Sequence, residues 1–141
     1  MNRKASAIWQ GGLKDGKGTI STESAVLSQT QYSFGTRFEN GKGTNPEELI
    51  AAAHAGCFSM ALSAELGKSG ITPSSIETAA TVTLEKMAAG WTVSKVHLDV
   101  KAKIPEADPA TFSAAAETAK ANCPISKLLN ATITMQAALE K

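Results

Sequence analysis

The chain has 141 residues, a common size for one folded unit, so we expect a single domain over residues 1–141. Its fourteen Lys and Arg residues nearly balance thirteen Asp and Glu, and the formal net charge is +1. The basic residues are scattered rather than gathered into a stripe, which argues against a nucleic-acid partner. The first ten residues contain no apolar run long enough for a signal-peptide core, so we expect a cytoplasmic protein.

The N-terminal segment has the alternation of a short β-hairpin. Apolar and polar residues alternate from Ala5 to Trp9, a glycine-containing turn follows from Gly11 to Gly16, and a second strand returns through Thr19 to Ser21. Residues 31–43 mix aromatic, glycine and polar residues. This composition predicts a loop or an edge strand that leads into a helix.

A helix from Pro46 to about Gly67 is the strongest local prediction. Asn45 can cap it, Pro46 has the right φ angle for the first helical position, and the next two residues are glutamates that favour a helix start. We expect the helix to end at Gly67 or Gly70.

This helix carries apolar residues on two sides, which predicts a buried helix and not a surface helix. A membrane span competes with that interpretation. His54, Ser59, Ser63 and Glu65 interrupt the apolar run. A spanning segment needs about 20 predominantly apolar residues, so we expect no membrane association.

Two alternating segments, from Ile76 to Leu84 and from Val96 to Ile104, predict an antiparallel hairpin that is covered on one face. Asp108 then precedes an alanine-rich helix that runs to about Asn122. Cys123 and Pro124 open a shorter helix, and residues 131–137 alternate as a last strand. The expected fold class is α+β, with antiparallel sheet packed around the long helix.

The chain has two cysteines, Cys57 and Cys123. Lasting disulfides are rare in the reducing cytosol, so the two are either inert packing residues or a transient redox pair. Cys57 lies at mid-helix, where a small buried hydrophobe is the default. Cys123 precedes Pro124 at a helix start, where free amides favour a thiolate. Local reasoning alone therefore favours Cys123 as the thiol with the lower pKa.

His54 lies three residues before Cys57, so the two side chains can meet on one helix face. Such a pair indicates an acyl-transfer nucleophile with its base, or half of a zinc site. Zinc would need both histidines and both cysteines, and their spacing matches no zinc-finger pattern. A core histidine bonded to a backbone carbonyl is the plainer interpretation. Glu47 can likewise be a helix-start carboxylate, and Arg37 an ordinary loop arginine.

Four segments carry these residues, and together they resemble the OsmC and Ohr family of thiol peroxidases. They are Thr36-Arg37-Phe38-Glu39, Gly43 to Leu49, Ala52 to Ala61 and Asn122 to Lys127. The similarity runs essentially end to end. Residues 9–12 and 18–24 make it closest to the osmotically inducible OsmC branch.

The resemblance implies that Cys57 is the peroxidatic cysteine and Cys123 the resolving cysteine, with Arg37 and Glu47 completing the site. It also implies antiparallel sheets around a long central buried helix, in an intertwined homodimer whose two sites each draw on both chains. Burial alone would raise the pKa of a thiol. A guanidinium from Arg37, held by Glu47, would favour the thiolate instead.

The implied activity is the reduction of organic hydroperoxides, and more weakly of hydrogen peroxide, in defence against oxidative and osmotic stress. Cys57 would pass through a sulfenic acid to a Cys57–Cys123 disulfide. An external dithiol, of the lipoyl type, would reduce that disulfide, and no metal or other cofactor is expected. Two alternatives stay open: a non-catalytic thiol sensor or apolar-ligand-binding module, and an acyl hydrolase that uses Cys57 with His54.

Overall fold

The structure, a computed structural model, describes all of residues 1–141. The chain divides into two compact units, Met1–Leu49 and Ile50–Lys141. Helix α2, Pro46–Lys68, begins in the first unit and continues into the second. The expectation of a single domain therefore stays a prediction.

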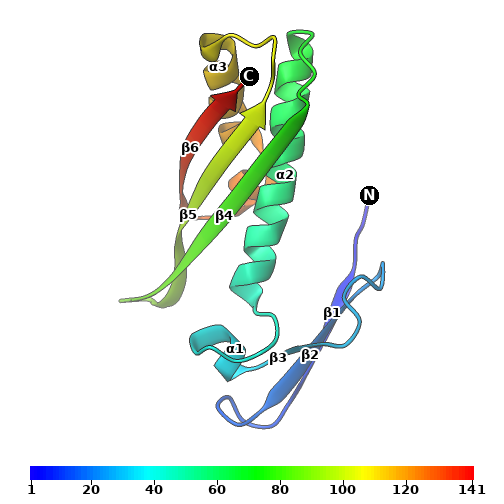
Figure 1. The fold of residues 1–141 in the computed structure, drawn as a ribbon. Helices are drawn as coiled ribbons and strands as arrows, with labels where there is room; N and C mark the ends of the chain where they lie inside the picture. The colour runs from blue at the N-terminus through cyan, green and yellow to red at the C-terminus, as the bar shows by residue number, and fades with distance from the viewer. The chain divides into compact units, whose positions relative to one another are not determined.

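The first unit contains a three-stranded antiparallel sheet (Figure 1). Strand β1 (Ala5–Gln10) pairs with β2 (Lys17–Thr22), which pairs with β3 (Thr30–Tyr32). The predicted hairpin is confirmed. Helix α1 (Phe34–Phe38) follows, where we expected a loop or an edge strand. With five residues it is too short for helical periodicity to show in the sequence.

A capping box fixes the start of α1. The Ser33 hydroxyl accepts a hydrogen bond from the Thr36 amide (3.2 Å), and the Thr36 hydroxyl accepts one from the Ser33 amide (2.8 Å). At the other end, the Asn45 side chain donates to the carbonyl of Thr36 (3.0 Å). Asn45 thereby ties α1 to the first turn of α2.

Helix α2 has the predicted ends. The Asn45 side chain accepts a hydrogen bond from the Glu48 amide (2.8 Å) at its start. At its end the Gly70 amide donates to Gly67 (3.0 Å) and the Ile71 amide to Leu66 (3.1 Å). Gly70 has a φ of 71°, so this is a glycine-dependent Schellman motif.

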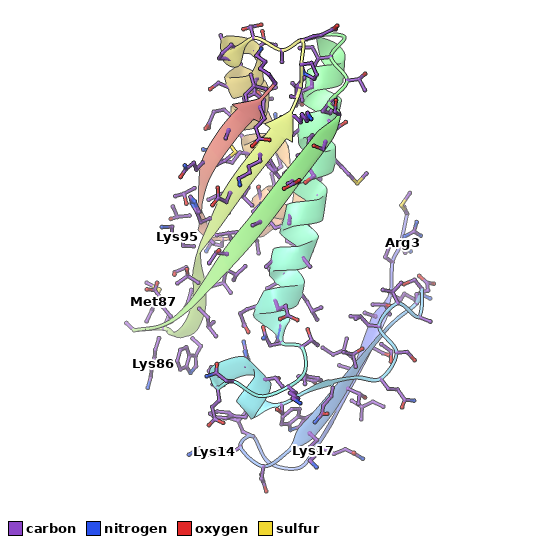
Figure 2. All side chains as sticks on the ribbon, in the orientation of Figure 1. Arg3, Lys14, Lys17, Lys86, Met87 and Lys95 are labelled. Atoms are coloured by element: carbon purple, nitrogen blue, oxygen red, sulfur yellow. The ribbon has the colours of Figure 1, made fainter.

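The second unit contains a three-stranded sheet in the order β4-β5-β6. Strands β4 (Ser75–Met87) and β5 (Gly90–Lys103) form the predicted antiparallel hairpin. Figure 2 labels Lys86 and Met87 near the turn that joins them. Strand β6 (Thr132–Glu140) pairs with β5 in parallel, so the expectation of purely antiparallel sheet is wrong.

The connection between β5 and β6 explains the parallel pairing. Helix α3 (Pro109–Asn122) and helix α4 (Pro124–Leu128) lie between the two strands, as the sequence predicted. Parallel neighbours need a long crossover of this kind, whereas antiparallel neighbours can be joined by a tight turn. The Asp108 side chain caps α3 by accepting a hydrogen bond from the Thr111 amide (2.9 Å).

One core joins α2, β5 and α3. Alternate β5 positions point into it, as their period of two predicted, and the helices contribute one stripe each. The main side chains are Val96, Leu98, Val100 and Ala102 of β5, Phe58, Leu62 and Leu66 of α2, and Phe112, Ala116 and Ala119 of α3.

Helix α2 is not buried on most of its circumference in the single chain. Its buried residues follow one stripe, His54, Phe58, Leu62 and Leu66, while Met60 on another side is 77% exposed. By length and composition alone the helix could cross a membrane, with a mean hydropathy of 1.4, but the core helix of a soluble protein passes the same test. The central, fully buried helix remains a prediction.

The packing predicts different costs for two identical truncations. Leu62 is fully buried, so Leu62→Ala should lower the free energy of unfolding by about 2–5 kcal/mol. Leu128 is 74% exposed, so Leu128→Ala should change it by no more than about 0.5 kcal/mol. Urea unfolding measures both values. Equal losses would contradict the assignment of the core.

Candidate active site

The two cysteines lie side by side. Cys57 is partly buried at the middle of α2, and Cys123, fully buried, ends α3 and begins α4. Both are free thiols, and the Cys123 side chain hydrogen-bonds to that of Cys57. The fold thus brings together two thiols that are far apart in the sequence.

The surroundings of Cys57 pull its pKa in opposite directions. Burial raises the pKa, a hydrogen bond from the backbone amide of Ile125 lowers it, and the neighbouring Cys123 thiol raises it again. The net effect is a raised pKa. A further positive group beside Cys57 would favour its thiolate.

The start of α4 does not act as local reasoning predicted. Its free amide at Ile125 donates to the sulfur of Cys57, and the side chain of Cys123 makes no capping hydrogen bond. The partial positive charge of this helix start therefore favours a thiolate at Cys57.

Arg37 and Glu47 form a two-pronged ion pair. The Nη2 atom of Arg37 lies 2.7 Å from Oε1 of Glu47, and Nε lies 3.1 Å from both carboxylate oxygens. The side chains are 37% and 13% exposed, respectively. The guanidinium carbon also lies 5.3 Å from the centre of the Phe38 ring. The two-pronged contact that the sequence predicted is present.

An apolar pocket of about 290 Å³ adjoins this arginine. Aromatic pairs shape it: the rings of Trp9 and Tyr32 lie 5.5 Å apart, and those of Phe34 and Phe38 lie 4.8 Å apart. The rest of its lining is Leu13, Ser33, Arg37 and Pro46. Such a lining suits a hydrocarbon group better than a small polar molecule.

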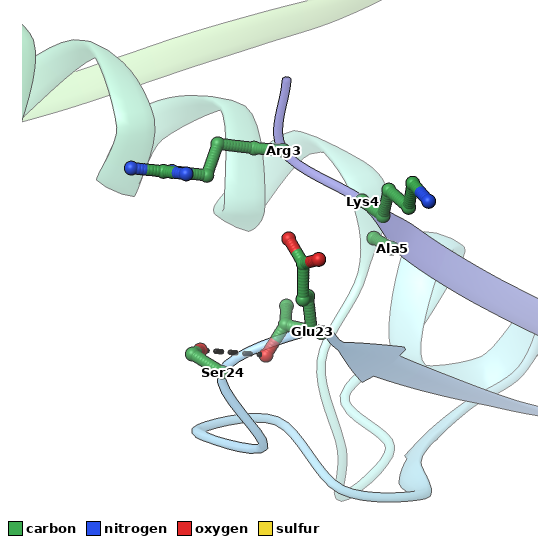
Figure 3. A pocket seen from close by; sticks show the side chains of 6 residues that line it. Arg3, Lys4, Ala5, Glu23 and Ser24 are labelled. Carbon is green, nitrogen blue, oxygen red and sulfur yellow. Dashed lines mark hydrogen bonds between the residues drawn. The ribbon is translucent and has the colours of Figure 1, made fainter. Parts of the chain in front are cut away.

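A larger and more open hollow of about 540 Å³ lies elsewhere in the first unit, beside the ends of β1 and β2 (Figure 3). Its lining includes Arg3, Lys4 and Glu23, and the hydroxyls of Thr22 and Ser24 lie 3.2 Å apart. Its lining contains charged side chains and no aromatic ring, so it suits a hydrocarbon group less well than the pocket beside Arg37.

His54 is fully buried and bonds to a side chain, not to the backbone carbonyl that we expected. Its Nε2 atom lies 2.7 Å from Oγ of Ser126, and its Nδ1 atom has no hydrogen-bond partner. Burial lowers the pKa of His54. No group of three or more His, Cys, Asp and Glu side chains is arranged to hold a metal ion.

Sequence reasoning missed two members of this site, the Ile125 amide and the Ser126 hydroxyl. A signal existed in the spacing. Cys123 and Ser126 are three residues apart, as are His54 and Cys57. Only the packing of α4 on α2 shows that these two spacings match.

Two adjoining free thiols, one under the amide of a helix start, are the arrangement that a dithiol redox protein needs. The chain belongs to the OsmC family: residues 39–138 match the model of the OsmC-like protein family. Peroxiredoxin OsmC of Escherichia coli K12 is 53% identical over 135 residues, covering 96% of this chain and 94% of that protein. Peroxiredoxin OsmC of Shigella flexneri shows the same values. The chain is thus a peroxiredoxin-type enzyme.

Solved structures support the fold. The organic hydroperoxide resistance protein OhrB of Bacillus subtilis matches with a TM-score of 0.70 and 24% identity, over 96% of this chain and 98% of that one. An OsmC-like protein of Vibrio cholerae matches with a TM-score of 0.78 and 16% identity, over 98% and 99%. At these identities the likeness establishes the α+β fold alone.

The lowered pKa of His54 predicts a pH dependence of stability. The unfolded chain, with an ordinary histidine pKa near 6.5, takes up a proton that the folded protein resists. Stability should therefore fall as the pH drops below about 7, by at most about 1.4 kcal/mol per pH unit, until the folded pKa is reached.

The test compares urea unfolding between about pH 7.5 and 5 for the wild type and His54→Asn. The variant should show a flatter profile. His97→Gln, which removes the other histidine, controls for the loss of an imidazole. Identical slopes in the wild type and His54→Asn would contradict the assignment.

Proposed function

We propose that this protein reduces organic hydroperoxides, and more weakly hydrogen peroxide, with Cys57 as peroxidatic and Cys123 as resolving cysteine. The observation that carries the proposal is the contact between the two thiols, in a chain of the OsmC family. The peroxidase activity serves defence against oxidative and osmotic stress.

In the first step the Cys57 thiolate attacks one oxygen of the peroxide. The O–O bond breaks, an S–O bond forms, and the departing alkoxide takes a proton and leaves as an alcohol, or as water from hydrogen peroxide. Cys57 is oxidised to a sulfenic acid. The Arg37 guanidinium, oriented by Glu47, offsets the effect of burial on the Cys57 pKa and stabilises the developing oxyanion.

In the second step the Cys123 sulfur attacks the Cys57 sulfenic sulfur. A disulfide forms, and the hydroxyl departs with a proton as water. An external dithiol of the lipoyl type then reduces the disulfide by two thiol–disulfide exchanges and is itself oxidised. Direct contact of the thiols supports this step, because no large movement has to precede it.

The apolar pocket beside Arg37 supports a preference for organic hydroperoxides. Its aromatic lining would bury the hydrocarbon part of the substrate, and hydrogen peroxide has no such part. OhrB of Bacillus subtilis is described as an organic hydroperoxide resistance protein.

The proposal includes an intertwined homodimer in the cytoplasm. The uncovered apolar side of α2, which includes Met60, supports burial against a second copy. A reducing compartment would return both cysteines to thiols after each cycle.

The main rival is a thiol sensor or apolar-ligand-binding module, which would be oxidised once or would hold a ligand without turnover. An acyl hydrolase is less well supported, because the Nε2 atom of His54 pairs with Ser126 and not with Cys57. Steady-state consumption of an alkyl hydroperoxide and of hydrogen peroxide, with dihydrolipoamide as donor, tests the proposal. Sustained turnover supports it; a single stoichiometric oxidation favours the sensor.

The two cysteines should have separable roles. Cys57→Ser should eliminate peroxide turnover, because only that sulfur attacks the peroxide. Cys123→Ser should keep one fast oxidation and then over-oxidise to the sulfinic acid, since nothing intercepts the sulfenic acid. Stopped-flow traces and mass spectrometry measure both outcomes. Loss of the first oxidation in Cys123→Ser, with retention in Cys57→Ser, would reverse the roles.

Arg37 and Glu47 should act as one unit. Arg37→Ala should raise the Cys57 pKa and slow its oxidation steeply, and Arg37→Lys should rescue little, because an ammonium lacks the planar fork. Glu47→Gln should cost less in the same direction. The double variant should be hardly worse than Arg37→Ala, with a coupling energy of about 0.5–3 kcal/mol.

The rate constant for Cys57 oxidation gives these values. Glu65→Gln provides the matched control, because Glu65 pairs with Lys68 (2.7 Å) at the other end of the same helix. It should leave the rate unchanged. Strict additivity of the Arg37 and Glu47 losses would reduce Glu47 to a helix-start carboxylate.

A further inference from the structure

Two contacts with matched spacing join α2 to the start of α4. Cys57 meets Cys123, and His54 bonds to Ser126 with 2.7 Å between Nε2 and Oγ. Within each element the two members are three residues apart, which places them on the same face. The bond between His54 and Ser126 therefore also fixes how Cys123 is aligned with Cys57.

Helix α4 cannot hold its own position. It has five residues, and no side chain caps its start. Helices this short are unstable in isolation, so tertiary contacts must place them. The side chains of Ile125 and Leu129 pack against the core, and the Ile125 amide donates to the sulfur of Cys57. Apart from these contacts at the Cys57 sulfur, the bond between Ser126 and His54 is the one side-chain hydrogen bond from α4 to another element.

His54 is suited to this anchoring role and to no other that the site requires. The ring is fully buried, and Nδ1 has no partner, so Ser126 is its sole polar contact. Buried polar groups are normally hydrogen-bonded, and a hydrogen bond in the protein interior is stronger than one in water. The bond to Ser126 therefore holds the His54 ring in place. His54 is not among the groups that shift the pKa of Cys57.

We infer that His54 and Ser126 are a positioning pair that holds α4 against α2, so that the Cys123 thiol and the Ile125 amide face the sulfur of Cys57. This inference rests on the proposed function. The pair controls the resolving step: water leaves and the disulfide forms only when the Cys123 sulfur is aligned with the sulfenic sulfur. The pair itself does not act on the peroxide; it affects the first step only through the Ile125 amide, which favours the Cys57 thiolate.

The kinetic test separates the two steps by stopped flow. Ser126→Ala and His54→Asn, whose shorter amide does not reach Ser126, should slow the first oxidation of Cys57 less than the resolving step, because they act on the first step only through the Ile125 amide. Disulfide formation should slow by about ten- to a hundredfold, as expected for reacting groups displaced by about 1 Å. More sulfinic acid should accumulate at high peroxide. His54→Gln, whose amide nitrogen takes the place of Nε2, should restore the rate.

An equilibrium test needs no peroxide. Titration against reduced and oxidised dithiothreitol measures the stability of the Cys57–Cys123 disulfide, and Ser126→Ala should make it easier to reduce, while His54→Gln should not. Ser59→Ala is the matched control, because the Ser59 hydroxyl also joins α2 to another element, at Thr78 (2.8 Å). It should leave the redox equilibrium unchanged.

The outcomes distinguish this inference from the proposed function. A wild type that peroxide does not oxidise at Cys57 would overturn the proposed function, while the dithiothreitol titration would still test the pair. Normal resolution and a normal redox equilibrium in a folded Ser126→Ala variant would overturn the inference. Lower unfolding stability with both readouts unchanged would overturn it equally, by showing that the bond is structural alone. If His54→Asn does not fold, Ser126→Ala decides.

Discussion

The chemistry of this protein depends on how the sulfur of Cys57 is enclosed between α2 and the start of α4. Enclosure brings the Cys123 thiol into contact, but it also raises the pKa of the Cys57 thiol, which is the reacting group in the proposed mechanism. The Ile125 amide offsets part of this effect, because a helix start directs free N–H groups at a neighbouring anion. In the proposed mechanism the remaining offset comes from the guanidinium of Arg37.

The two compact units contain different parts of the proposed chemistry. The first unit holds the paired guanidinium of Arg37 and an aromatic pocket, and the second holds both thiols. A guanidinium fixed by a carboxylate loses little entropy when it orients a substrate, which is why the grip of Glu47 matters. Substrate recognition and redox exchange can thus be altered by different sets of residues.

The crossover between β5 and β6 sets the position of Cys123, the proposed resolving cysteine. It contains α3 and α4, and Cys123 lies at the break between them, where Pro124 prevents one continuous helix. The break turns the thiol into the core and leaves the Ile125 amide free to reach Cys57. The sheet therefore becomes mixed for the same reason that the two cysteines meet.

Local signals in the sequence determined most of the elements. These signals act over a few residues, so they can be found without a structure. They are the cap and proline of α2, the period of two in β4 and β5, and the Asp108 cap of α3. Helix α1 was not predicted, because its five residues are too few to show a helical period. The antiparallel prediction for β6 failed because strand direction depends on the path of the chain, not on the alternation of side chains.

Some residues of the candidate site could likewise be predicted from the sequence. The sequence predicted Cys57, Cys123, Arg37 and Glu47 through the family resemblance, and the structure pairs the last two between α1 and the first turn of α2. It favoured Cys123 as the more acidic thiol, because local reasoning sees a helix start and not what that start faces. Only the tertiary structure decided that the Ile125 amide bonds to Cys57 and that Ser126 bonds to His54, because both contacts join residues separated by about half of the chain.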